Sequence, residues 1–508
     1  MKQIRYYQII TAFCCLLLIS CGIDKNLKKG EKFLSLGEYN DAADQFKQAY
    51  TKTPPKEREN RGKLALKMAR CYNKINATPK AVNAYRNAIR YNQASLDDRL
   101  AYARLLQKNG EYKQAEKEFR ILVDSMPDNI LAQNGLKSAQ MAPGWKKAGS
   151  RYQVKKMDVF TSRRADYSPM LLGDEADQLY FTSTRNDAQG DELSGITGTK
   201  AGDIFYSEKD DKGKWSRPEA IATGLNTDYD EGACCFTPDG KEMYLTQCVT
   251  DPASPRFAQI VTSSRSDAAW GKVQKLEITQ DTLSTYAHPA ISPDGEWLYF
   301  VSDMPGGMGG YDIWRVRLTP SGLGGVENLG APINTPGDEM FPTFRPNGDL
   351  YFSSNGHIGM GGLDIYIARI DEKTQQYKIE HPGYPLNSEA DDFGMTFEGP
   401  HNRGFFSSNR KDGRGYDHIY SFQNPEIVTT MKGWVYEKDG YELPAAQVMV
   451  VGNDGTYKKL PVKGDGSFTM PIHPKVDYLV MASCKGFLNH KEELRIDSAK
   501  ESKEYVLQ

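Results

Sequence analysis

The sequence lacks most of the features that would assign it directly to a class of enzyme or of nucleic-acid-binding protein. Its 508 residues carry 64 Lys and Arg against 66 Asp and Glu, a formal net charge of −2, so no basic excess indicates nucleic-acid binding. Its seven histidines form no H-E-x-x-H motif and no other metal-ligand spacing, and no G-x-S-x-G segment is present. We therefore predict no catalytic residues, no metal, no cofactor and no enzymatic activity.

Cysteine is scarce and scattered, which excludes the dense disulfide framework of small secreted domains. Three of the eight cysteines lie within the first 21 residues, and an odd number is spread over the rest of the chain. The adjacent Cys234 and Cys235 are predicted to pack within a strand rather than to hold a metal.

Long apolar runs are absent except near the N-terminus. Residues 9–19 form an apolar run after Lys2 and Arg5, and this run is shorter than the roughly 20 residues that span a bilayer. Residues 1–20 therefore have the organisation of a signal peptide. The sequence Leu-Ile-Ser-Cys that ends at Cys21 resembles a bacterial lipobox. The resemblance implies that Cys21 carries a lipid and holds the protein to a membrane; ordinary secretion is the alternative.

Helical repeats are predicted for residues 21–145. One pattern recurs at spacings of 39 and 34 residues, as Ala42-x3-Phe46-x2-Ala49, Ala81-x3-Tyr85-x2-Ala88 and Ala115-x3-Phe119-x2-Leu122. A further small residue precedes each copy by twelve residues: Gly30, Ala69 and Ala103. The pattern resembles the tetratricopeptide repeat, a helix–turn–helix unit of about 34 residues. The small residues are predicted to let paired helices approach closely, and the aromatic rings to fill the gaps between pairs.

Charge is distributed unevenly along the chain. Residues 24–147 hold 25 Lys or Arg and 14 Asp or Glu, a net charge of +11, whereas the remaining chain after Cys21 carries −15. Either these basic residues are ordinary solvated helix faces, or they form a groove for an acidic partner or lie near anionic lipid. In the usual repeat geometry Lys63, Arg70 and Arg104 fall on the concave helices, so we predict that these three contact such a partner.

Short β-strands predominate between residues 150 and 425, and they recur in units. The units begin near Pro169, Cys234, Pro289, Pro342 and Gly394, at spacings of 65, 55, 53 and 52 residues. Each unit has two apolar strands joined by a tight turn, then a glycine-rich turn, then a third strand and a further short strand. Four-stranded units that repeat at this period predict a β-propeller of five blades, with six as the alternative.

The glycine-rich stretch at residues 348–366, GDLYFSSNGHIGMGGLDIY, is one of these turns. A phosphate-binding loop needs a helix N-terminus after its glycines, but the following DIYIARI is predicted to be a strand. The aspartates predicted to start third strands are Asp203, Asp312, Asp364 and Asp417. We predict that each one hydrogen-bonds within its own blade; calcium binding is the alternative. Residues 152–160 are predicted to supply the missing outer strand of the fifth blade.

The C-terminal segment, residues 427–508, alternates short strands with Gly-Asp turns, which predicts a small β-sandwich. Its pattern around Gly433, Pro444, Val448 and Phe468 resembles the carboxypeptidase regulatory-like domain. That resemblance implies a prealbumin-like sandwich without catalysis.

The S-P-D-G…Y-F-x-S…D-I-Y pattern of residues 150–425 resembles the PD40 or TolB-like propellers.

The order of these domains closely resembles the PorE-like periplasmic lipoproteins of Bacteroidota, which are associated with type IX secretion. The resemblance implies a non-enzymatic scaffold for protein–protein interactions in the cell envelope, lipid-anchored in the outer membrane and facing the periplasm. Members also carry a C-terminal OmpA-like domain that binds peptidoglycan; none precedes Gln508, so we expect no peptidoglycan binding. The alternative function is a lipoprotein that binds a small ligand, a glycan or a peptide, in the propeller channel.

Overall fold

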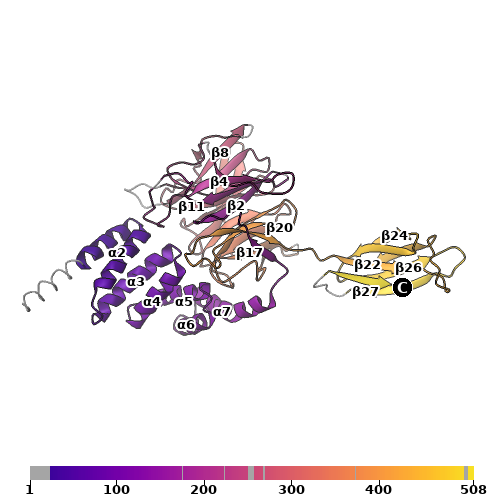
Figure 1. Ribbon diagram of the computed structural model, residues 1–508, viewed down its shortest axis with the longest axis horizontal. Coiled ribbons are helices and arrows are strands. Elements are labelled where there is room, and N and C mark those ends of the chain that lie inside the picture. Colours follow the sequence, from indigo (N-terminus) through magenta and orange to yellow (C-terminus); the bar gives the residue numbers. More distant parts are fainter. Residues whose placement is uncertain are drawn as a thin grey trace, which may run out of the picture. The chain divides into compact units, whose positions relative to one another are not determined.

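The computed structural model describes residues 23–507 apart from 174, 191, 222–223, 250–256, 267–268, 372 and 497–501. The chain divides into two compact units, Met1–Gln423 and Asn424–Gln508. Helices precede β-sheets along the chain (Figure 1), which confirms the predicted multidomain layout of helices followed by β-structure. Cys21 and the predicted signal peptide lie outside the described residues. Among the residues that are described, no helix is both long and apolar enough for a membrane span.

The helical part of the first unit is an array of consecutive antiparallel helices. After a helical segment at residues 23–35 come α2 (Tyr39–Lys52), α3 (Arg58–Lys74), α4 (Thr78–Arg90), α5 (Leu96–Lys108), α6 (Tyr112–Ser125) and α7 (Ile130–Ala148). Phe46, Tyr85 and Phe119 are at most 2% exposed. A Cβ added to Gly30 would lie 2.5 Å from the Phe46 ring, so the small residue is needed where the ring packs between helices.

Five antiparallel sheets follow, which we call blades 1 to 5. Their strands are β2 (Asp166–Leu172), β3 (Gln178–Ser183), β4 (Asp203–Glu208) and β5 (Glu219–Ala220) in blade 1; β6 (Asp230–Phe236), β7 (Glu242–Val249), β8 (Phe257–Ser266), β9 (Ala269–Trp270) and β10 (Gln274–Lys275) in blade 2; β11 (Tyr286–Ile291), β12 (Trp297–Ser302), β13 (Asp312–Thr319) and β14 (Gly322–Asn328) in blade 3; β15 (Glu339–Phe344), β16 (Leu350–Ser354), β17 (Asp364–Ile370) and β18 (Tyr377–Glu380) in blade 4; and β19 (Asp392–Phe397), β20 (Arg403–Ser408) and β21 (His418–Gln423) in blade 5.

The five blades form a closed ring, the arrangement of a β-propeller. The first strand of each blade contacts the first strands of its two neighbours, in the order β2, β6, β11, β15, β19 and back to β2. Blade 5 takes its fourth strand from β1 (Gln153–Lys156), which pairs antiparallel with β21 from Gln153↔Gln423 to Lys156↔Tyr420. The predicted closing strand is thereby confirmed, and it removes a sheet edge that could pair with other chains.

The second unit contains two sheets around one core. One sheet has the order β25 (Ser467–Ile472), β22 (Thr429–Trp434) and β28 (Lys503–Leu507); the other has the order β24 (Tyr457–Pro461), β23 (Gln447–Gly452), β26 (Asp477–Ser483) and β27 (His490–Arg495). Side chains from both sheets, including Met431, Val448 and Tyr478, share one buried apolar cluster. Two packed sheets are a sandwich architecture.

Candidate functional site: a cavity between the helices and the propeller

The propeller axis is filled by side chains and leaves no open channel. Each of the five first strands has a register irregularity near the axis. The rings of His288 and Phe341 stack at 3.7 Å between centroids, and Phe341 contacts Phe393 at 4.5 Å. The hollow that remains beside these residues measures about 20 Å³, which is room for about one water molecule. Packed rings therefore close the axis at this level, and a ligand site in the channel stays a prediction for the ends of the axis.

The strand register corrects the position of one predicted aspartate. Asp203, Asp312 and Asp364 each lie opposite the serine that ends the preceding strand. In blade 5 the residue opposite the corresponding Ser408 is His418, so Asp417 lies one position earlier than its supposed equivalents. The carboxylates of Asp203, Asp312 and Asp364 accept hydrogen bonds from backbone N–H groups of their own glycine-rich turns.

Neighbouring blades are joined by a repeated polar device that we call the seam link. In three seams an asparagine side chain bonds the backbone of one isoleucine, the second residue of the third strand. The asparagine oxygen accepts from the isoleucine N–H, and the asparagine NH2 group donates to the isoleucine C=O. These asparagines are Asn226, Asn334 and Asn387. The next residue, Thr or Ser, donates through its backbone N–H and its hydroxyl to an acid that starts the following blade: Glu231, Glu339 or Asp392. The seam link thus satisfies buried backbone groups at each joint.

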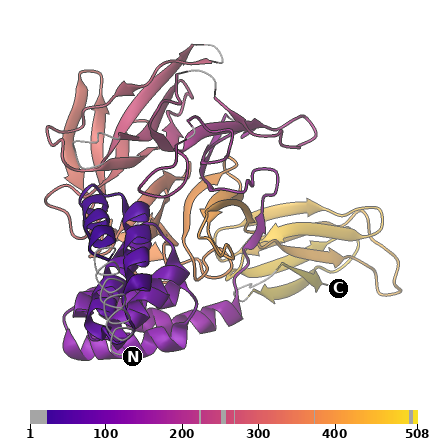
Figure 2. The same cartoon turned by 60° about the vertical axis from the view of Figure 1, so that its left-hand side comes forward.

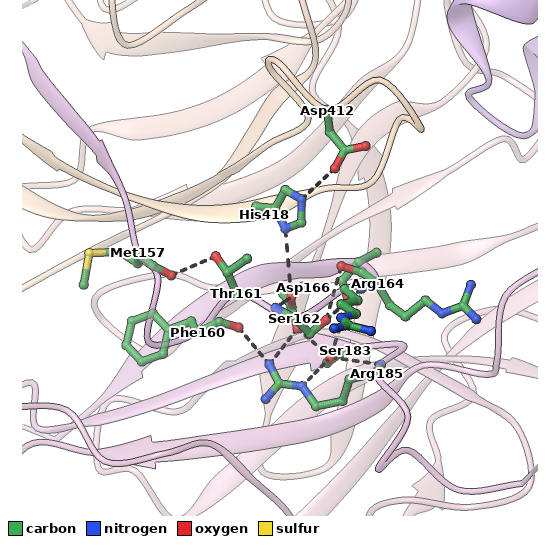
Figure 3. A network of polar contacts seen from close by, with 12 residues as sticks. Met157, Phe160, Thr161, Ser162, Arg164, Asp166, Ser183, Arg185, Asp412 and His418 are labelled. Carbon is green, nitrogen blue, oxygen red and sulfur yellow. Dashed lines mark hydrogen bonds and ion pairs between the residues drawn. The ribbon is translucent and has the colours of Figure 1, made fainter.

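The seam that closes the ring uses a different polar cluster (Figure 3). Asp166 accepts from the Ser183 hydroxyl at 2.6 Å and from the Arg185 guanidinium at 2.6 Å. On the blade 5 side, His418 Nε2 lies 3.0 Å from Asp412, and its Nδ1 lies 4.0 Å from Asp166. Burial alone acts to raise the pKa of Asp412, but hydrogen bonds from Arg414 and His418 hold that pKa well below its usual range.

This closing cluster contains a serine, a histidine and carboxylates, but substrate cannot reach it. Ser183 and Asp166 are fully buried and His418 is 2% exposed. The serine hydroxyl donates to Asp166 rather than to the histidine, whereas an activated serine nucleophile needs a hydrogen-bonded base and an open approach. The arrangement holds blade 5 against blade 1 and is not an active site.

The predicted groove residues of the helices have three different environments. Arg104 donates to the backbone carbonyl of Asn355 at 3.0 Å, within the glycine-rich turn of blade 4. Arg70 of α3 forms a two-pronged ion pair with Asp98 of α5, and Lys63 forms an exposed pair with Glu59 one turn away. The structure does not bring the three together at one surface, and contact with an acidic partner stays a prediction for Lys63 and Arg70.

The helical array is held on the propeller mainly through polar groups, and Figures 1 and 2 show the helices alongside the blades. Asn134 donates to the Gly356 carbonyl at 2.9 Å, and the Gly359 N–H donates to the Ser138 hydroxyl at 3.0 Å. The buried Lys108 pairs with Asp391 at 2.5 Å, and both contact the Asn76 amide. The glycine-rich turn of residues 355–362 is therefore the surface on which α5 and α7 are seated.

A cavity of about 530 Å³ lies beside this contact, between the α3–α4 turn and the ends of blades 5, 1 and 2. We call it the junction cavity. Its propeller wall includes Tyr167, Asp230 and Asp417, and its helical wall includes Lys74 and Asn76. Hydroxyl groups of Thr184, Thr197 and Thr199 and the ring of Tyr416 complete the lining. The volume falls in the range of 300–1,000 Å³ that is usual for small-molecule sites.

Two acidic groups of the junction cavity, the Asp417 carboxyl and the Tyr167 phenol, have raised pKa values. The Oδ1 atom of Asp417 is buried without a hydrogen-bond partner. Burial, reinforced by the nearby carboxylate of Asp391, raises the pKa of Asp417 to about 7. Burial also raises the pKa of Tyr167 well above its usual value, so this hydroxyl remains a donor at neutral pH. The cavity thus offers a carboxyl group that can donate or accept, together with a phenol, hydroxyls and an amide.

Sequence reasoning did not identify the junction cavity. The sequence indicates Asp417 only as a member of a repeat, and no pattern in it indicates Tyr167, Asp230 or Asn76. The signal available in the sequence was the departure of blade 5 from its repeat, where His418 stands in place of the usual aspartate. Among the described residues, no group of three or more His, Cys, Asp or Glu is arranged to hold a metal ion.

Comparison with known proteins finds similarity only among solved structures, since no protein-family model and no curated protein matches. An endo-arabinase from Bacteroides thetaiotaomicron is 16% identical with a TM-score of 0.34, covering 56% of this chain and 99% of its own. A thermostable family-43 glycoside hydrolase is 11% identical with a TM-score of 0.34, covering 53% and 91%. The soluble aldose sugar dehydrogenase of Escherichia coli is 8% identical with a TM-score of 0.30, covering 54% and 100%.

The scaffold interpretation is corrected at this point. Within this chain, Arg104 of the supposed partner groove is bound by the propeller itself. The alternative of a small-ligand protein agrees better with this contact and with the presence of the junction cavity.

Proposed function

We propose that the protein binds a small, hydroxyl-rich ligand, an oligosaccharide, in the junction cavity. The observation that carries the proposal is the Asp417 carboxyl group: Asp417 lines a cavity of about 530 Å³, and its buried Oδ1 has no hydrogen-bond partner. A polar group in that position costs free energy unless it gains a partner. A sugar hydroxyl supplies both a donor and an acceptor, and so fits Asp417 in either protonation state.

The rest of the lining supports this ligand class. Tyr416 and Tyr167 provide aromatic surface for the apolar C–H face of a sugar ring, and the threonine hydroxyls and Asn76 provide further hydrogen-bonding groups. Lys74, Lys80 and Arg414 at the cavity would also accept an acidic sugar. A short peptide is the competing ligand, because it too carries donors and acceptors. We further propose that a lipid on Cys21 holds the protein to the outer membrane.

The test uses thermal unfolding of the chain with neutral, acidic and amino-sugar oligosaccharides and with short peptides. A ligand that binds only the folded state stabilises it, by about 2.7 kcal/mol at one hundred times its Kd. Because a hydrogen bond to a charged group contributes about 1.5–3 kcal/mol, Asp417→Asn with Tyr167→Phe should weaken binding at least tenfold. Asp211→Asn, in the exposed turn after β4, is the matched control. Saturation by a peptide alone, or binding unaffected by the two substitutions, would reject the proposal.

A further inference from the structure

The opposite end of the propeller axis holds a second cavity, of about 350 Å³, which we call the lower cavity. It is lined by the turns between first and second strands of blades 1 and 2, by Ala290 and Ile291 of blade 3, and by Thr343 and Phe344 of blade 4. The stacked rings of His288, Phe341 and Phe393 close the axis between this cavity and the junction cavity. The lower cavity is therefore a separate site.

One basic side chain lines the lower cavity. Arg265, at the end of β8, has its guanidinium 5.1 Å from the centroid of the buried Trp270 ring. Its Nη2 lies 3.3 Å from the position that a Cβ on Gly240 would take, so the absence of a side chain at Gly240 leaves room for the guanidinium at the wall. Stacking on an aromatic face fixes the orientation of an arginine without neutralising its charge.

Arg265 differs from its equivalents in other blades. The residue at the same register position in blade 1 is Lys209, which pairs with Glu398 at 3.6 Å. In blades 3 and 4 the residues at this position are the uncharged Leu318 and Ile370. Arg369, one position earlier in blade 4, pairs with Asp349 at 3.1 Å and also with Glu380. No carboxylate pairs with Arg265 among the residues that the structure describes.

The one carboxylate among the residues that line the lower cavity is Asp239, and one of its oxygens accepts hydrogen bonds within its own turn. Asp239 Oδ1 accepts from the Thr237 hydroxyl at 2.7 Å and from the Lys241 N–H at 3.2 Å, within its own turn. The remaining lining is largely apolar or uncharged, with Met170, Leu172, Phe236 and Ile291 around the arginine. An oriented, unneutralised guanidinium beside apolar surface is suited to an anionic group on a compact body.

We propose that the lower cavity binds a small organic anion through Arg265, whose planar fork receives a carboxylate or a phosphoryl group. The two sources share the bidentate chemistry of the guanidinium. Three probes with the same sugar body separate them: glucuronate carries a carboxylate, glucose 6-phosphate carries a phosphoryl group, and glucose carries no charge. The volume of about 350 Å³ accommodates a body of this size.

Binding is measured by thermal unfolding and by tryptophan fluorescence, since Trp270 stacks on the guanidinium. Saturable binding is expected with at least one anionic probe and not with glucose. Arg265→Gln should weaken it at least tenfold, and Arg265→Lys should weaken it less, because lysine keeps the charge and loses the fork. Arg369→Gln is the matched control and should bind normally.

Asp417→Asn separates this proposal from the junction cavity, and it should leave anion binding unchanged. The proposal is overturned if glucose binds as well as the anions, if Arg265→Gln binds them normally, or if none of the three probes gives a saturable response.

Discussion

The seam between blades 2 and 3 differs from the seams that carry the link. In the three linked seams an asparagine bonds an isoleucine backbone, and an acid starts the next blade. Between blades 2 and 3 the equivalent positions hold Asp281 and Tyr286, and Asp281 instead accepts from Leu283 and Ser284 of its own loop. A cavity of about 250 Å³ lies at this seam, lined in part by Ile260 and Tyr286.

The comparison shows that one seam of a repeat protein can lack these side-chain hydrogen bonds while the ring of blades remains closed. The Leu276 N–H still donates to the Ile260 carbonyl, as outer segments donate to the equivalent isoleucine in linked blades. The backbone hydrogen bond between the third strand and the outer segment is therefore retained. What is missing is the side-chain amide and the acid that follows it. The stability of the ring is therefore expected to be distributed unevenly among its seams.

The largest effect should come from the closing seam. Arg185→Met removes the partner of Asp166, in a pair whose side chains are 11% and 0% exposed. Breaking a buried pair costs about 3–5 kcal/mol, because the remaining charge is left buried. Arg315→Met removes an exposed pair with Glu327 and should cost at most about 1 kcal/mol. Urea unfolding of both variants measures the difference in the free energy of unfolding. Equal losses would show that the closing seam contributes no more stability than the exposed pair.

The next effect tests the seam link directly. Asn334→Ala removes both hydrogen bonds to the Ile313 backbone, which are 2.9 Å long. The Ile313 carbonyl still accepts from the Leu329 N–H, so the Ile313 N–H is the group that loses its side-chain partner. Loss of this kind costs about 1–3 kcal/mol. Asp281→Ala, at the equivalent position of the unlinked seam, should cost about 1 kcal/mol or less. Thermal unfolding of the two variants side by side would contradict the comparison if Asp281→Ala were the more damaging.

A third difference between the seams is their response to pH. Burial is the main reason that the pKa of Glu339 is raised to about 7. Because its folded pKa lies above its unfolded value, this group stabilises the fold below about pH 4.5, and that contribution is lost as pH rises through about 7, by roughly 2–3 kcal/mol. Glu339→Gln should abolish this loss between about pH 4.5 and 7. Tyr286→Phe, at the equivalent position between blades 2 and 3, should leave the pH profile unchanged.

The smallest expected effect is a gain. Asp281→Asn supplies an amide where the linked seams have one, and its oxygen can still accept from Leu283. A net hydrogen bond contributes about 0.5–1.5 kcal/mol, so the variant should unfold at a slightly higher temperature than the wild type. A loss of stability would mean that Asp281 is needed as a carboxylate for its own loop.

Local sequence patterns predict most of the first unit. The small and aromatic residues of the helices could be placed because each packs against a neighbour in the next helix, as Gly30 does against Phe46. The blades could be placed because each repeats the same turns, and β1 could be placed because blade 5 is one strand short. These features depend on contacts between segments that are adjacent in sequence or related by the repeat.

The candidate site could not be predicted in the same way. The junction cavity depends on where the helices are seated on the propeller, through contacts such as Lys108 with Asp391 that are unrelated to any period. The seam asparagines were present in the sequence as the recurring pairs Asn-Thr and Asn-Ser, but their role depends on backbone groups of another strand. The register irregularities recur at Pro169, Pro289 and Pro342, but the filling of the axis by His288 and Phe341 depends on how the five first strands meet.

The pairing of β1 with β21 also determines when the protein can fold. Gln153 pairs with Gln423, and a ribosome that adds about 5–20 residues per second needs roughly 15–55 s to make the chain between them. During that interval the helices can fold on short-range contacts, whereas β1 has no partner strand and its backbone groups stay unpaired. The ring must close late, in a step that joins the first strand of the ring to its last strand.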